Sequence, residues 1–115
     1  MRNIKITELN EMAREASELL AAMANEKRLM ILCHLLEGET SVNELAELVA
    51  MNQSALSQQL AKLRALKLVD TRRDAQQVYY RLASVDVERI LQTLYGIYCD
   101  PKTKTAKIRS QQART

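Results

Sequence analysis

Two short amphipathic helix patterns separated by only three residues constrain the fold of this chain more than any other feature of its sequence. The first pattern covers residues 41–50, and the second covers residues 54–66 after a break at 51–53. Ser41 and Asn52 precede the two patterns and are candidate N-caps, because their side-chain oxygens can accept the free amides of a first helical turn. Two short helices joined this tightly predict a helix-turn-helix unit.

The second helix of the unit has two different faces. Leu56, Leu60 and Leu63 fall on one side, and small or polar residues fall on the other. Small side chains let a helix approach the major groove of DNA closely, and Ser57 and Gln58 can form hydrogen bonds with base edges. The pattern favours a DNA-reading helix, although any short helical hairpin has a similar periodicity.

A β-hairpin is predicted directly after this helix. Residues 68–73 and 77–82 are rich in β-branched and aromatic residues, and the polar segment 74–76 connects them. A hairpin in this position is a wing, and its positive charge suits phosphate or the minor groove. A structural hairpin with solvated arginines is the alternative. The arginines concerned are Arg72, Arg73 and Arg81.

Three further helix patterns complete the chain, over residues 8–23, 26–36 and 85–98. Their candidate N-caps are Thr7, Asn25 and Ser84, and Gly38 and Pro101 mark two of the helix ends. We therefore expect residues 1–100 to form one domain, mainly α with a small β-hairpin. It would be a winged helix-turn-helix of about five helices. The basic segment 101–115 is expected to be a disordered tail.

Charge is distributed unevenly along the chain. Residues 1–51 carry five Lys or Arg against nine Asp or Glu, whereas residues 52–82 carry six against two. The tail adds five basic residues and no acid. This segregation favours a polyanionic partner bound by one face, with a solvated charged face as the alternative. The N-terminus lacks a secretory signal pattern and no apolar run is long enough to span a bilayer, so we expect a cytoplasmic protein without membrane contact.

The chemistry-bearing residues are few. Cys33 and Cys99 are the two cysteines of the chain, and His34 is its one histidine. Two cysteines are too few for a disulfide scaffold, and composition alone favours buried thiols that act as small apolar groups. The sequence has no CxxC, no HExxH and no glycine-rich phosphate loop, so we do not expect an enzyme, a cofactor or a metal site.

Three segments carry a resemblance to a known family. The stretches AMANEKRLMIL, NQSALSQQLAKLR and TRRDAQQVYY resemble the arsenic-repressor (ArsR/SmtB) family of winged-helix regulators, and the likeness extends over about residues 8–100. It implies a homodimer, joined through the first and last helices, that binds an inverted repeat in double-stranded promoter DNA. The residues that it assigns to bases are Gln53, Ser54, Ser57 and Gln58, and those that it assigns to phosphates or the minor groove are Lys62, Arg72 and Arg73.

Within this family the cysteines match a narrower subgroup. The helix over residues 41–50 lacks the cysteines of arsenic sensors, and the last helix lacks the histidine of zinc sensors, so a metal-responsive repressor is the least favoured alternative. Cys33 and Cys99 sit where dithiol persulfide-sensing repressors carry theirs. This resemblance implies a disulfide or polysulfide bridge, formed by reactive sulfur species or an oxidant, that lowers DNA affinity.

Two further inferences about the thiols remain open in the sequence. Asp100 and the carbonyl end of the last helix would oppose a thiolate at Cys99, so Cys33 is the expected attacking thiol. A similar nodulation repressor has much the same sequence in the DNA-binding segments but lacks the cysteine pair. A constitutive regulator with structural cysteines is therefore the alternative, and the sequence does not distinguish repression from counteracting a silencer.

Overall fold

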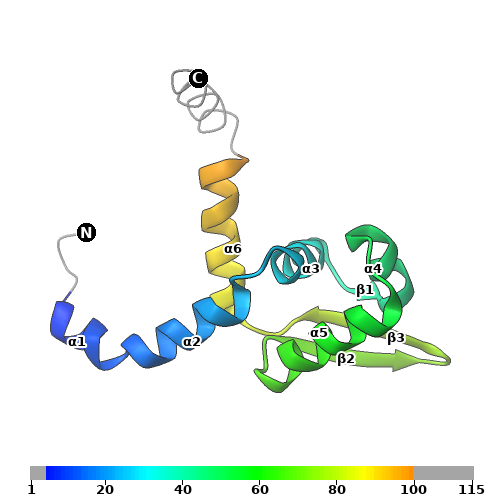
Figure 1. Ribbon diagram of the computed structural model, residues 1–115, viewed down its shortest axis with the longest axis horizontal. Helices are drawn as coiled ribbons and strands as arrows, with labels where there is room; N and C mark the ends of the chain where they lie inside the picture. The colour runs from blue at the N-terminus through cyan, green and yellow to red at the C-terminus, as the bar shows by residue number, and fades with distance from the viewer. Residues whose placement is uncertain (1–4, 100–115) are drawn as a thin grey trace.

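The computed structural model describes residues 5–99, and over that range the chain forms six helices and one three-stranded sheet (Figure 1). An arm made of the first two helices extends to one side of the last helix, and the remaining helices and the sheet gather on the other side. The elements in chain order are α1 (Ile6–Glu11), α2 (Ala13–Met23), α3 (Glu26–Glu37), β1 (Thr40–Ser41), α4 (Val42–Val49), α5 (Gln53–Ala65), β2 (Val69–Asp74), β3 (Gln77–Leu82) and α6 (Val85–Tyr98). The basic segment 101–115 lies outside the described residues.

Four of the five expected N-caps are confirmed. The side chains of Asn25, Ser41, Asn52 and Ser84 each accept a backbone N–H from the first turn of the helix that follows. Such caps satisfy donors that have no partner within the helix. Thr7 was expected to cap the first helix and lies instead inside α1, so that prediction is wrong.

The first expected helix, over residues 8–23, is interrupted. Helices α1 and α2 meet at Met12, whose backbone angles are φ −96° and ψ 2°. No residue of α1 is buried, and Leu9 and Met12 are about half exposed. The two segments do not pack together against a core of this chain that would keep them collinear. The apolar periodicity therefore predicted the helices but not the break between them. The six helices replace the expected five for this reason.

The core lies between α3, α4, α5 and the base of the sheet. Leu56, Leu60 and Leu63 are buried, as predicted, and they join Ile31 and Leu32 of α3 in one cluster. Each fully buried leucine contributes about 1.5–3 kcal/mol relative to an exposed one. This packing fixes the inner face of α5 and leaves its outer face rigidly presented to solvent. No helix within residues 5–99 has the length and hydrophobicity to cross a membrane.

The sheet has one more strand than the sequence indicated. The expected hairpin forms from β2 and β3, and the two-residue strand β1 pairs with the other side of β3, in the order β1-β3-β2. All pairings are antiparallel, and one row of the sheet aligns Ser41, Tyr79 and Arg72. Strand β1 follows α3 after only two residues, so the wing is anchored to the end of α3.

Candidate nucleic-acid interface and cysteine pocket

The outer face of α5 presents the side chains that the sequence assigned to bases. Gln53, Ser54, Ser57 and Gln58 are exposed, as is Lys62 one turn further on. Their opposite face carries the three buried leucines, so the exposed face is fixed by packing and not by its own contacts. The side-chain amide of Gln53 donates a hydrogen bond to Asn43 of α4, which orients this residue at the first turn of α5.

A polar cleft of about 330 Å³ lies between this helix and the wing. Gln53 and Ser57 line it from α5, and Arg73 lines it from β2. Further polar residues that were not predicted from the sequence line the same cleft, among them Asn43, Arg64, Gln76 and Gln77. Arg64 had a signal, because it lies seven residues after Ser57 and so on the same helix face. The contribution of Asn43 depends on how α4 and α5 cross, which periodicity does not report.

The three wing arginines differ in their surroundings. Arg73 lines the cleft, whereas Arg81 lies 3.8 Å from Asp70, its neighbour across the hairpin. Arg72, next to Arg73 in a strand, points to the other face of the sheet. The sequence predicted positive charge along the whole hairpin, and the structure places one of these arginines in the cleft beside α5.

Arg72 is held on two sides. Its Nη2 lies 2.6 Å from Oε1 of Glu39, and its Nε donates to both carboxylate oxygens at 3.1 and 3.2 Å. The guanidinium also lies over the ring of Tyr79, 4.7 Å from the ring centroid. The hydrogen bond from Arg72 holds the pKa of Glu39 below its ordinary value, and the same bond raises the pKa of Arg72. The expected phosphate contact of Arg72 stays a prediction.

The two cysteines line one apolar pocket. Cys33 of α3 and Cys99, the C-cap residue of α6, both border a pocket of about 640 Å³ between these helices, and both are free, exposed thiols. Leucines from both helices and the rings of Tyr95 and Tyr98 form most of its wall. Residues 66 positions apart are thus brought to one site, as the resemblance implied.

The electrostatics of the pocket disfavour an ionised Cys33. Burial against the apolar wall raises the pKa of the Cys33 thiol, and the nearby Cys99 adds to the shift. Thiolate is the nucleophilic form, so this shift reduces the reactive fraction at neutral pH. It weighs against Cys33 as the attacking thiol, the role that the sequence analysis assigned to it. Asp100, on which that assignment also rested, lies outside the described residues.

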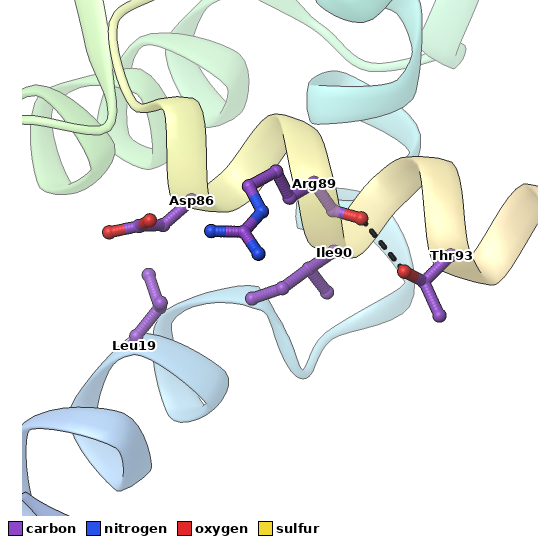
Figure 2. Close-up of a pocket in the computed structure, with 5 residues that line it drawn as sticks. All are labelled: Leu19, Asp86, Arg89, Ile90 and Thr93. Carbon is purple, nitrogen blue, oxygen red and sulfur yellow. Dashed lines mark hydrogen bonds between the residues drawn. The ribbon is translucent and has the colours of Figure 1, made fainter. Parts of the chain in front are cut away.

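A second pocket lies in the angle between α2 and α6 (Figure 2). Its volume is about 360 Å³, and Figure 2 shows the Arg89 side chain lying between Asp86 and Ile90, opposite Leu19 of α2. Exposed apolar side chains occur along the arm and on the last turn of α6. We call this set the arm–α6 surface, and it consists of Ile6, Leu9, Met12, Leu20, Tyr95, Ile97 and Tyr98. Within residues 5–99 no three His, Cys, Asp or Glu side chains are grouped so that they could hold a metal ion.

Known proteins share both the sequence and the fold. Residues 25–71 match the family model described as bacterial regulatory protein, arsR family. The chain is 47% identical over 96 residues to the transcriptional activator HlyU of Vibrio cholerae, covering 84% of this chain and 89% of that one. It is 53% identical over 93 residues to the nodulation protein NolR of Rhizobium meliloti, covering 81% and 76%. The crystal structure of the transcriptional repressor BigR from Xylella fastidiosa superposes with a TM-score of 0.80 at 37% identity, covering 84% and 99%.

Proposed function

The chain belongs to the ArsR family of bacterial regulatory proteins, which bind DNA and regulate transcription, and from this premise we propose that it is a sequence-specific repressor whose DNA affinity falls when Cys33 and Cys99 are bridged. The observation that carries the thiol response is the shared pocket, because two exposed thiols on different helices border one cavity. The exposed polar face of α5 beside an arginine-lined cleft supports the DNA-binding part.

The proposed active form is a homodimer. A chain of 115 residues has a small core, and the arm–α6 surface leaves seven large apolar side chains exposed. Pairing two copies through this surface would cover them. A two-fold axis would then present two α5 helices to an inverted repeat, whose half-sites lie about 34–36 Å apart along the duplex.

The proposed chemistry uses one persulfide per chain. One cysteine thiolate attacks the outer sulfur of an organic persulfide R–S–SH, which forms a cysteine persulfide and releases the thiol RSH. The second thiolate then attacks the inner sulfur of that cysteine persulfide, which closes the disulfide and releases hydrogen sulfide. The reaction stops when the disulfide has formed, so each chain reacts once, as a sensor does. Continued consumption of persulfide in the presence of a reductant would indicate an enzyme instead.

DNA binding before and after bridging tests the proposal. Fluorescence anisotropy with DNA from the protein's own promoter is measured on reduced protein and after treatment with an organic persulfide, and mass spectrometry follows the bridge. We expect at least tenfold weaker binding after treatment, equivalent to about 1.4 kcal/mol. Cys33→Ser and Cys99→Ser variants should bind as the reduced protein does under both conditions. A reporter gene then distinguishes repression from activation, since HlyU is named an activator and BigR a repressor.

A constitutive regulator is the second candidate, and one observation favours it. Burial raises the pKa of Cys33, which makes this thiol less reactive at neutral pH. Equal binding by the reduced and treated proteins would establish this candidate and end the thiol proposal. If neither form prefers promoter DNA over random DNA, sequence-specific recognition itself is wrong.

A further inference from the structure

We propose that Glu39 and Arg72 form a clamp that ties the wing to the end of α3, and that Arg72 positions the wing instead of binding a DNA phosphate. The clamp also links Cys33 to the wing, so that bridging of the thiols displaces the wing; this second part rests on the proposed function. The proposal differs from the expectation that Arg72 holds phosphate or the minor groove.

The geometry of Arg72 supports a positioning role. Two of its nitrogens bond to the Glu39 carboxylate, Tyr79 stacks on its plane, and the Asp74 carboxylate lies 3.9 Å from a third nitrogen. A planar fork is the group that fits a carboxylate in this bidentate way. Leaving this site for a phosphate would break the stacking and the hydrogen bonds, and it would leave the Glu39 charge facing the DNA backbone.

The clamp acts on orientation more than on stability. The side chain of Arg72 is 48% exposed and that of Glu39 is 30% exposed. Ion pairs in such positions are screened by water and add little to the free energy of unfolding. They do restrict where the two elements sit, because the carboxylate and the guanidinium belong to segments 33 residues apart. The clamp therefore limits the angle of the wing relative to α3.

A short segment connects the clamp to the cysteine pocket. Cys33 and Glu37 lie one turn apart on α3 and border the same pocket, and Glu37 is the last residue of that helix. Only Gly38 separates Glu37 from Glu39, and its φ of +149° is one that other residues rarely adopt. The hydroxyl of Thr40 donates to the Gly38 carbonyl at 3.0 Å, and β1 begins at Thr40. Because one residue separates Glu39 from the end of α3 and a hydrogen bond holds the turn, a tilt of α3 would displace Glu39 as well.

Salt dependence of operator binding tests the role of Arg72. Each phosphate contact contributes about 0.9 to the slope of log Kobs against log salt. We expect Arg73→Gln to lower the slope by about this amount per chain, and Arg72→Gln to leave it unchanged. A loss of slope in Arg72→Gln equal to that in Arg73→Gln would overturn the clamp.

An Arg72→Lys variant gives a second readout. Lysine keeps the charge but lacks the planar fork, so it would satisfy a phosphate and not the clamp. We expect the preference for operator over random DNA to fall at least threefold in Arg72→Lys and Glu39→Gln. Asp74→Asn is the matched control, since it removes an equal charge beside the same arginine without touching the tie to α3, and its preference should not change. Full preference in Arg72→Lys and Glu39→Gln would contradict the proposal, and circular dichroism confirms that each variant is folded.

The link to the thiols is measured as the ratio of the dissociation constants of bridged and reduced protein. We expect this ratio to fall at least threefold in Glu39→Gln and to stay at the wild-type value in Asp74→Asn. Helix α3 also contacts α5 directly, because Arg28 Nε donates to Gln59 Oε1 at 3.0 Å. If the ratio is unchanged in Glu39→Gln but falls in Gln59→Ala, the thiols are coupled to DNA binding through α5. That result would overturn the proposed coupling through the wing. A wild-type ratio of one would end the thiol proposal and the link with it, whereas the salt slopes would still decide the clamp.

Discussion

At the scale of single residues, Glu39 has a distinctive environment, because it lies between the end of α3 and the wing. Its carboxylate accepts three hydrogen-bond contacts from one guanidinium, and these lower its pKa. The small stabilisation by this exposed ion pair is therefore present at pH values above the ordinary carboxyl pKa of 4.5, and it is lost as the pH falls through the lowered value in the folded state.

The lowered pKa of Glu39 can be tested by titration. We expect the Glu39 carboxyl carbon, followed by nuclear magnetic resonance, to titrate below 4.5 in the wild type. In Arg72→Gln the midpoint should return towards the ordinary value, because the largest cause of the shift is removed. An unchanged midpoint in that variant would show that Arg72 does not hold Glu39 in solution.

Cys33 gives a second prediction at this scale, with the opposite sign. Burial disfavours its thiolate, so we expect the rate of alkylation by iodoacetamide to rise with pH to a midpoint above the ordinary value of 9.0. Cys99→Ser should lower the midpoint only partly, because burial is the larger cause and repulsion by Cys99 the smaller. A midpoint that is not raised in the wild type would contradict the partial desolvation of Cys33 by the pocket wall, and would favour Cys33 as the attacking thiol.

Single residues also differ in whether their surroundings could be predicted from the sequence. The faces of α5 follow from helical periodicity, so Ser57 and Gln58 were assigned to the exposed face directly. The partner of Arg72 could not be found this way, because Glu39 lies 33 residues away and meets it only through the pairing of β1 with β3. A strand of two residues has no periodicity to detect.

At the scale of elements, the start of α5 carries two of the residues that we propose contact bases. Asn52 caps this helix by accepting the amide of Ala55, and Gln53 and Ser54 occupy the turn that the cap fixes. The four caps were predictable because they depend on residues close in sequence. The break between α1 and α2 was not predictable, because it depends on the tertiary contacts of the helix and not on residues close in sequence.

Removing the α5 cap should affect both stability and recognition. We expect Asn52→Ala to lower the free energy of unfolding by about 1 kcal/mol, measured by urea denaturation. Asn25→Ala removes the cap of α3 and should cost a similar amount. Only Asn52→Ala should weaken operator binding under conditions where both variants remain folded. Equal weakening by both would mean that the effect comes from lost stability and not from the first turn of α5.

At the scale of the whole molecule, the arm–α6 surface sets the expected assembly. Leu20 on α2 is 55% exposed within this surface, and Leu48 on α4 is 47% exposed outside it. We expect Leu20→Glu to raise the dissociation constant of the dimer at least tenfold in sedimentation equilibrium, because a charge would be buried at the interface. Leu48→Glu is the matched control and should leave the dimer intact. Dissociation by both variants, or by Leu48→Glu alone, would place the interface elsewhere.

Helix α6 belongs to two surfaces at once, because Tyr95 and Tyr98 border the cysteine pocket and are also part of the arm–α6 surface. Substitutions in the last turn of this helix are therefore expected to alter the proposed dimer interface and the shape of the pocket together. Cys99 borders the same pocket but lies after the last helical residue. A substitution there therefore changes the pocket wall without interrupting the helix.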